Sequence, residues 1–205
     1  MNRSIFREYD VRGLVDEDLQ TDIVLNLGRA IGTYAANHGV QTMTLGRDCR
    51  LSSPALSAVI QEGLLASGVD VIDIGTCATP ILYFSVRHLG TGGGVMVTGS
   101  HNPPEFNGFK ICVGPDTIYS SEIQALREII EKGSFRSGSG RASGRDVAQA
   151  YLDTIFENVK VRPGLRVVLD GGNGVGGRFA VPLFERFGCD LHGIHIDMDG
   201  RFPNH

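Results

Sequence analysis

Residues 98–110 read Thr98-Gly99-Ser100-His101-Asn102-Pro103-Pro104-Glu105-Phe106-Asn107-Gly108-Phe109-Lys110, and this stretch decides how the chain on either side of it folds. The apolar run at 94–97 predicts a buried strand before it, and the alternating run at 109–113 predicts a half-buried strand after it. Two prolines stiffen the intervening loop, and Asn107-Gly108 is typical of a tight turn. We therefore expect a rigid loop that holds the hydroxyl of Ser100 between two strands.

The chemistry that best suits Ser100 is the carrying of a phosphoryl group. No Gly-x-Ser-x-Gly turn surrounds it and no acid–His pair can be placed beside it, which argues against an acyl-transfer serine. A phosphoserine has a charge of roughly −1.5 to −2 and needs nearby cations and donors. His101, Lys110 and the loop amides could supply them. For Gly-Ser-His alone, a plain turn serine would be the better interpretation.

The composition is that of an ordinary globular protein. The chain has 205 residues and a net charge of −4, without the basic run that would indicate a nucleic-acid partner. No apolar stretch approaches the ~18 residues that span a bilayer, and the N-terminus lacks a signal-peptide core. The four cysteines are scattered without a Cys-x-x-Cys pair, which favours reduced thiols. We therefore predict a cytoplasmic protein with no membrane partner.

The stretch at 98–110 resembles the active-site serine loop of the α-D-phosphohexomutases, the phosphoglucomutase and phosphomannomutase family, and is most similar to the bacterial bifunctional branch. The resemblance continues in four motifs spread along the sequence, so that it extends over nearly all of the chain. They are Phe-Arg-Glu-Tyr-Asp-Val-Arg-Gly at 6–13, Gly-Arg-Asp at 46–48, Asp-Gly-Gly-Asn-Gly at 170–174 and Asp-Gly-Arg-Phe-Pro-Asn-His at 199–205.

The resemblance implies an isomerase that interconverts hexose 1-phosphate and 6-phosphate, with glucose or mannose as the sugar. Ser100 would be phosphorylated in the resting enzyme and would donate its phosphoryl group to form a bisphosphate intermediate, with hexose 1,6-bisphosphate as activator. Arg12 and Lys110 would stabilise the charge of the moving group, and one of them could relay a proton. A guanidinium suits this task because it binds phosphate oxygens in pairs.

Four further residues are expected near the reacting group. The resemblance places Tyr9 in the lining of the site, within a polar N-terminal segment that folds back beside Ser100. His101 and Asn102 are expected to orient the loop or to bind phosphate. Arg47 follows a predicted strand at its carboxyl end, where open α/β sheets often bind ligands. An ion pair between Arg47 and its neighbour Asp48 that pins the loop is at least as good an interpretation.

The resemblance also implies one magnesium ion that bridges a phosphate oxygen on Ser100 and three aspartates of an Asp-Gly-Asp-x-Asp-Arg loop. That loop is not among the 205 residues, so its aspartates are expected beyond the chain end. We therefore expect an N-terminal fragment that is inactive alone. An uncovered strand edge or apolar face would promote self-association or disorder near residues 190–205.

Alternating strand and helix patterns predict an α/β fold with a mixed, mainly parallel sheet flanked by helices in a first domain, residues 1–145. Strands are expected at 42–45 and 69–74, and helices at 19–38, 54–66, 79–89 and 120–132. Residues 133–145 are rich in Gly, Ser and Arg, which is typical of a flexible connector.

Residues 146–205 repeat the order of strand, acidic turn, helix, glycine and strand, which predicts a similar but incomplete second α/β unit. Its Gly172-x-Gly174-x-x-Gly177 turn also has the layout of a dinucleotide fingerprint, so an NAD-binding oxidoreductase is one alternative. Asp170 before the turn and the unexplained serine loop weigh against it. A non-catalytic sugar-phosphate-binding module is the other alternative.

Overall fold

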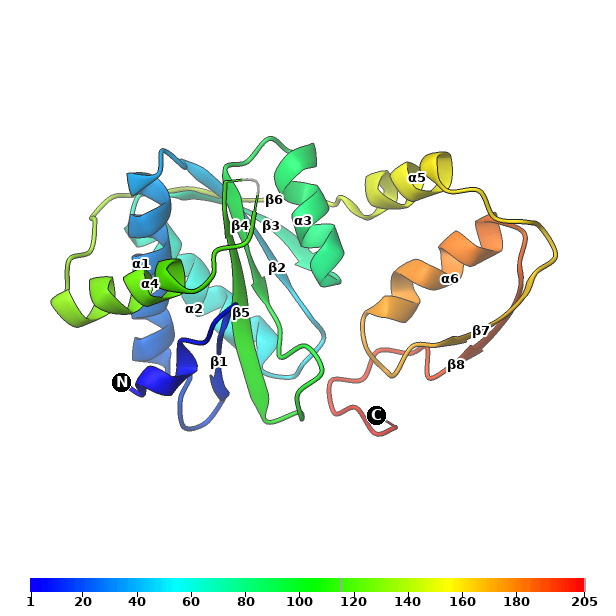
Figure 1. Cartoon of the computed structure of the whole chain (residues 1–205), viewed down its shortest axis with the longest axis horizontal. Helices are drawn as coiled ribbons and strands as arrows, with labels where there is room; N and C mark the ends of the chain where they lie inside the picture. The colour runs from blue at the N-terminus through cyan, green and yellow to red at the C-terminus, as the bar shows by residue number, and fades with distance from the viewer. Residues whose placement is uncertain (115, 205) are drawn as a thin grey trace.

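The computed structural model describes residues 1–114 and 116–204, which form two α/β units (Figure 1). The first unit contains a six-stranded sheet with the strand order β1-β5-β4-β2-β3-β6. Its strands are β1 (Val11–Leu14), β2 (Thr42–Arg47), β3 (Asp70–Thr76), β4 (Gly93–Val97), β5 (Phe106–Val113) and β6 (Ala142–Gly144). Strands β4, β2, β3 and β6 run parallel, whereas β5 is antiparallel to both β1 and β4. The predicted mixed, mainly parallel α/β fold is therefore confirmed.

Helices cover both faces of this sheet, with α1, α2 and α4 on one side and α3 on the other (Figure 1). They are α1 (Thr21–Asn37), α2 (Ser53–Ala66), α3 (Thr79–His88) and α4 (Ser121–Lys132), after a short 3-10 turn at Arg3–Ile5. None of the helices in the described part of the chain is long and apolar enough to cross a membrane.

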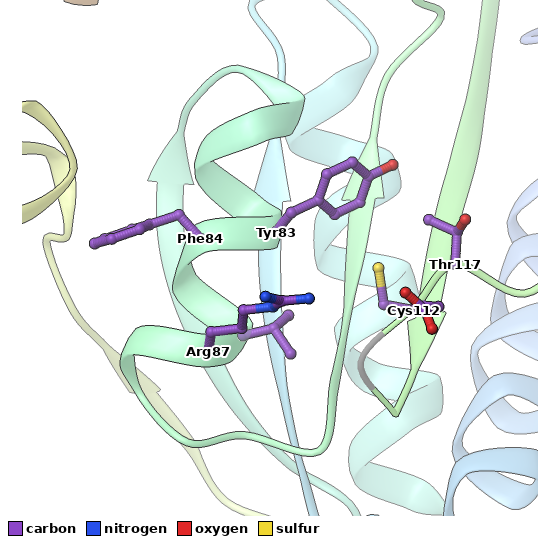
Figure 2. A pocket seen from close by; sticks show the side chains of 7 residues that line it. Tyr83, Phe84, Arg87, Cys112 and Thr117 are labelled. Atoms are coloured by element: carbon purple, nitrogen blue, oxygen red, sulfur yellow. The ribbon is translucent and has the colours of Figure 1, made fainter. Parts of the chain in front are cut away.

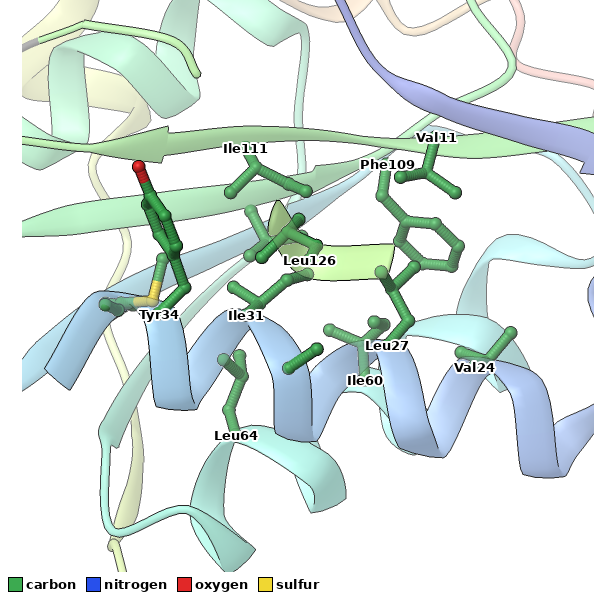
Figure 3. Close-up of a cluster of buried hydrophobic side chains, with 14 of the residues drawn as sticks. Val11, Val24, Leu27, Ile31, Tyr34, Ile60, Leu64, Phe109, Ile111 and Leu126 are labelled. Atoms are coloured by element: carbon green, nitrogen blue, oxygen red, sulfur yellow. The ribbon is translucent and has the colours of Figure 1, made fainter. Parts of the chain in front are cut away.

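The main core lies between the sheet and α1, α2 and α4. Alternate residues of the strands, such as Val95 and Val97 or Phe109 and Ile111, point into it and are almost completely buried (Figure 3). Removing this apolar surface from water supplies most of the stability of the unit. Because successive side chains of a strand alternate between faces, Lys110 lies on the opposite side, toward α3.

Glycines let α1 and α2 pack unusually close together. A Cβ atom on Gly28 would lie 2.6 Å from the carbonyl oxygen of Ile60, and one on Gly63 would lie 2.5 Å from that of Leu25. Because both contacts are with backbone, no side-chain movement could relieve them.

The polar N-terminal segment 6–13 contributes to the edge strand β1, in which Val11 is completely buried against Phe109. The turn predicted at Asn107-Gly108 is wrong, because both residues continue β5. Gly108 is needed there because a Cβ atom would lie 2.4 Å from the carbonyl oxygen of Val11.

The connector at 133–145 is not a free linker. The backbone amides of Gly138 and Gly140 donate to carbonyl oxygens at the end of α2, and β6 then pairs in parallel with β3. Phe135 packs against the main core, with the guanidinium of Arg29 4.2 Å from its ring centroid. The composition of the connector did not predict this attachment to the sheet. Backbone hydrogen bonds and small residues at the sheet edge produce no pattern of apolar residues in the sequence.

The second unit contains α5 (Ala148–Asn158), β7 (Arg166–Asp170), α6 (Gly176–Arg186) and β8 (Asp190–Ile194). Strands β7 and β8 are parallel, with both helices on one side (Figure 1). On the other side the strands leave a face uncovered that is mixed in character, with Val168 (70% exposed) and Ile194 (36% exposed) among the charged or polar residues Arg166, Asp170, Asp190 and His192. Self-association through that face stays a prediction. Residues 199–204, for which disorder was one expectation, instead fold against the first unit.

Candidate functional site

The serine loop joins β4 to β5 at the edge of the sheet where the parallel strands end. Ser100 is exposed and has a φ of 53°, a left-handed conformation that is costly for a residue with a side chain. Its amide donates to Oγ1 of Thr98 (2.9 Å), and Asn102 donates to the carbonyl oxygen of Gly99 from both its backbone and its side chain. The loop therefore holds the Ser100 hydroxyl outward.

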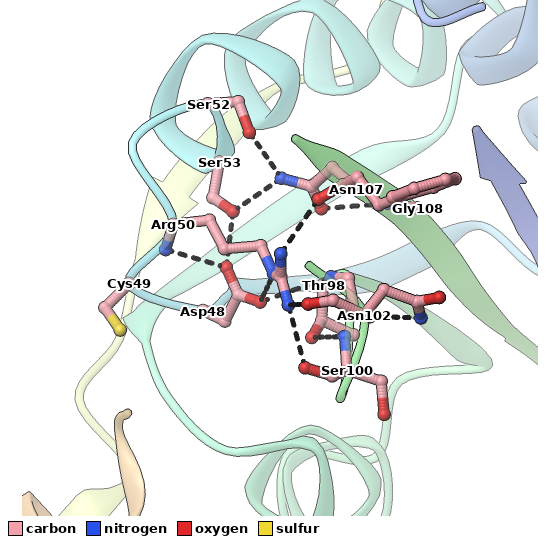
Figure 4. A network of polar contacts seen from close by, with 12 residues as sticks. Asp48, Cys49, Arg50, Ser52, Ser53, Thr98, Ser100, Asn102, Asn107 and Gly108 are labelled. Carbon is pink, nitrogen blue, oxygen red and sulfur yellow. Dashed lines mark hydrogen bonds and ion pairs between the residues drawn. The ribbon is translucent and has the colours of Figure 1, made fainter. Parts of the chain in front are cut away.

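Arg50 fixes the backbone of this loop (Figure 4). Its guanidinium is only 2% exposed and donates four hydrogen bonds to loop carbonyl oxygens. The acceptors are Ser100 (2.9 Å), Asn102 (2.6 Å), Pro103 (2.7 Å) and Phe106 (3.0 Å). Each hydrogen bond to a charged group contributes about 1.5–3 kcal/mol, so the contacts rigidify the loop strongly.

Asp48 completes the support of Arg50. One carboxylate oxygen accepts from the Arg50 amide (3.0 Å) and the Ser53 hydroxyl (2.5 Å). The other accepts from the amide of Gly99 and lies 3.3 Å from Nε of Arg50, which has no aligned hydrogen-bond partner among the described residues. A Cβ atom on Gly99 would lie 2.4 Å from Cζ of Arg50, so the guanidinium fits only beneath a glycine.

A cavity of about 510 Å³ opens in front of Ser100. Both units line it with the residues Arg50, Ser100, His101, Asn102, Pro103, Pro104, Gly172 and Phe202. The exposed ring of His101 brings its Nδ1 to 3.4 Å from the Ser100 hydroxyl. The predicted trio of Ser100, His101 and Asn102 thus shares one open site.

Two predicted cations lie together on the neighbouring strands. Nη2 of Arg12 is 2.6 Å and Nζ of Lys110 is 3.4 Å from the same oxygen of Asp10, which is 5% exposed. Two cations on one carboxylate leave a surplus of positive charge. Arg12 pairs with Gly108 of β5, whose carbonyl oxygen accepts from the amide of Thr98 on the other side. Arg12 on β1 therefore lies about two strand spacings, roughly 10 Å, from the start of the serine loop, whereas Lys110 on β5 pairs directly with Met96 of β4.

Tyr9 and Arg47 do not join these groups. The Tyr9 side chain is 69% exposed and contributes nothing to the lining of the cavity in front of Ser100. Arg47 does not pair with Asp48 as proposed. Its Nη1 instead lies 3.1 Å from both carboxylate oxygens of Asp73 on β3, because parallel neighbours bring these two side chains together.

The glycine-rich turn of the second unit follows β7 and precedes α6, as the sequence indicated. Its amides are already used: Gly172 donates to Asp170, Asn173 to the carbonyl oxygen of His195, and Gly174 to that of Gly171. A dinucleotide-binding turn must offer such amides to a pyrophosphate. The arrangement therefore disfavours the NAD-binding alternative.

A second cavity, of about 390 Å³, lies beside α3 and contains none of the predicted site residues (Figure 2). Tyr83, Arg87 and Cys112 lie along it. Burial raises the pKa of the Cys112 thiol to about 12, and burial also raises the pKa of Tyr83. Neither group is an activated nucleophile, so this cavity offers no competing reaction centre.

The donor set for a metal was tested against the described residues. Within residues 1–114 and 116–204, no three His, Cys, Asp or Glu side chains are grouped so that they could hold a metal ion. The residues that the structure describes therefore do not fit a magnesium cage.

Sequence reasoning missed Asp10 and Arg50, and it paired Asp48 with Arg47 where the structure pairs it with Arg50. Asp10, Asp48 and Arg50 are charged residues that the fold buries. Charged residues are almost never fully buried unless they are paired, so their burial marks a structural or functional task. The available signal was the position of Asp48 and Arg50 directly after a buried strand, at the sheet edge that also carries Ser100.

Comparisons with known proteins identify one family. Residues 3–137 match the family model of phosphoglucomutase/phosphomannomutase, alpha/beta/alpha domain I. The chain is 43% identical over its full length to a phosphoglucomutase of Neisseria gonorrhoeae, and 43% identical over 98% of its length to a phosphomannomutase/phosphoglucomutase of Pseudomonas aeruginosa. It covers 45% and 44% of these relatives, so it spans about half their length.

A solved structure gives the same result. The crystal structure of a phosphoglucomutase/phosphomannomutase family protein from Burkholderia thailandensis matches all of this chain, and 46% of its own chain, with a TM-score of 0.95 at 39% identity. The family model covers well over half of the chain and includes the serine loop, Arg12 and Lys110. The chain therefore belongs to the phosphoglucomutase/phosphomannomutase family.

Proposed function

We propose that the protein takes part in the interconversion of hexose 1-phosphate and hexose 6-phosphate, with Ser100 as the residue that carries the phosphoryl group. The observation that supports this most is the exposed Ser100 hydroxyl on a loop whose backbone four Arg50 hydrogen bonds hold in place. A preorganised position suits phosphoryl transfer, which depends on alignment and on neutralising charge.

The proposed transfer begins with phosphorylated Ser100. A free hydroxyl oxygen of the hexose monophosphate forms a bond to phosphorus while the bond from phosphorus to Oγ of Ser100 breaks, and the hydroxyl proton passes to a base. The bisphosphate then reorients and returns its other phosphoryl group to Oγ. Arg12 and Lys110 stabilise the negative charge, and His101 and Asn102 orient the loop.

The choice between glucose and mannose rests on the relatives alone, whose names include both sugars. We expect the chain by itself to be inactive in the interconversion of the 1- and 6-phosphates of either sugar. A magnesium ion would need protein ligands other than the described residues, and none of the steps above depends on it.

The test is incubation of the chain with hexose 1,6-bisphosphate labelled in its phosphate groups, followed by peptide mass spectrometry. We expect up to one phosphoryl group per chain, on Ser100. Ser100→Ala should lose all label, whereas Ser143→Ala, which changes an exposed serine in β6, should keep it. Label on another residue, or wild-type label in Ser100→Ala, would contradict the assignment.

A further inference from the structure

We propose that Arg50 is a positioning residue through which residues 199–204 of the second unit set the conformation of the serine loop. This inference deepens the proposed function, because the loop concerned carries Ser100. The guanidinium of Arg50 faces the loop with its four hydrogen bonds, and its remaining surface faces Phe202, whose ring centroid lies 5.1 Å from Cζ. One side chain thus touches both units.

Backbone contacts seat the 199–204 segment on the residues around Arg50. A Cβ atom on Gly200 would lie 2.3 Å from the carbonyl oxygen of Cys49 and 2.9 Å from the amide nitrogen of Leu51. This approach is as close as two backbones allow, so Gly200 and the Cys49–Leu51 backbone constrain each other. Displacement of the segment would uncover the face of Arg50 that Phe202 now covers.

A second set of contacts fixes the segment to the glycine-rich turn. The amide of Asp199 donates to the carbonyl oxygen of Asn173 (2.9 Å), and the side chain of Asn204 donates to Oδ1 of Asn173 (2.9 Å). Asn173 is 7% exposed and has a φ of 56°. The segment is therefore held by the second unit while it presses on the first.

The chemistry of an arginine explains why this position can couple the two parts. The planar guanidinium offers five donors in a fixed fork and can stack on an aromatic ring at the same time. With four donors committed to loop carbonyl oxygens, a tilt of the plane lengthens several of these bonds together. The Phe202 ring limits that tilt, so the position of the ring is transmitted to the loop backbone.

Amide hydrogen exchange of the chain, followed by NMR, tests this coupling without relying on turnover. The reporters are the loop amides of Gly99, Ser100, Asn102 and Phe106, each of which donates a hydrogen bond. We expect Phe202→Ala to speed their exchange about five- to tenfold, consistent with the loss of a cation–π contact. Phe202→Tyr keeps the ring and should restore the wild-type rates. The amides of β2 should not change.

The chain offers a matched control in the second unit, where Arg186 lies over the Phe156 ring at 3.9 Å. Phe156→Ala should leave the loop amides unchanged. Arg50→Lys, which keeps the charge but loses the fork, should speed their exchange more than Phe202→Ala. Adding Phe202→Ala to Arg50→Lys should then have little further effect.

Two outcomes would overturn the proposal. The first is unchanged loop exchange in Phe202→Ala, which would separate the second unit from the loop. The second is a rise spread evenly over β2 and the loop, which would indicate a general loss of stability. Absence of phosphoryl label on Ser100 together with the expected exchange pattern would count against the proposed function and not against this coupling.

Discussion

Residues 1–145 form a six-stranded sheet with helices on both faces and a large core under α1, α2 and α4, whereas residues 146–204 leave one face of a two-stranded sheet open. In the described part of the second unit, the buried apolar side chains are Val147 and Phe179, and both pack in a cluster with residues of β3 and α3. The same order of elements thus gives a first unit with a large core and a second unit whose buried side chains pack on the first. The two units differ more in the apolar surface that they bury than in the local pattern of their sequences.

The largest expected difference between the units is in the cost of truncating an aromatic side chain. Phe109→Ala should lower the free energy of unfolding by about 3–5 kcal/mol, because it leaves a cavity in the main core. Phe156→Ala removes a ring that stacks on Phe187 in partial contact with water and should cost about 1 kcal/mol. Urea unfolding followed by circular dichroism measures both. Equal costs would mean that the second unit has a core of its own.

Breaking an ion pair should also destabilise the first unit more than the second, although the difference should be somewhat smaller than for the aromatic side chains. Asp48→Asn leaves the buried guanidinium of Arg50 without its carboxylate, and we expect a loss of about 3 kcal/mol. Asp153→Asn breaks an exposed pair with Arg186 and should cause no measurable change. The same unfolding experiment compares the two variants. A stable Asp48→Asn protein would show that hydrogen bonds alone hold the serine loop.

The smallest expected effect is on the stability of the 199–204 segment at acid pH. Hydrogen bonds from Arg201 lower the pKa of Asp199 from its ordinary value of 3.8 to about 2. Since the folded pKa is the lower one, this carboxylate stabilises the segment above about pH 4 and loses that contribution as the pH falls through 2. A carboxyl-carbon NMR titration should show a midpoint near 2, which moves upward in Arg201→Gln. An ordinary midpoint in the wild type would mean that the pair is not formed.

The sequence predicted the elements whose pattern is repeated and apolar. Helix α1 and the strands of the main core can be recognised from the spacing of their apolar residues. A helix buries one residue or two at each turn, and a strand buries alternate residues. Strand β1 was missed since a single buried Val11 carries its apolar signal, and β6 was missed since its pairing uses backbone and small residues. The prediction of a turn at Asn107-Gly108 was wrong because a glycine, which permits a turn, also permits a close approach between strands.

Part of the candidate site could be predicted from the sequence. The stretch 98–110 taken as a whole named Ser100 and His101 as candidates, and the structure places both side chains on an outward loop. The pairing of Arg12 and Lys110 through Asp10, and the support of the loop by Arg50, depend on which strands become neighbours. Strand order is set by long-range packing, which no local spacing encodes.

The pairing of β6 with β3 also limits where the molecule can bend. The connector stays bonded to the sheet through Arg145, whose amide donates to the carbonyl oxygen of Asp73 on β3, and Val147 then packs against residues of β3 and α3. Any rotation of the second unit relative to the first would therefore have to begin after Val147. A rotation that opens the cavity in front of Ser100 would also pull the ring of Phe179 out of the cluster that it shares with β3 and α3.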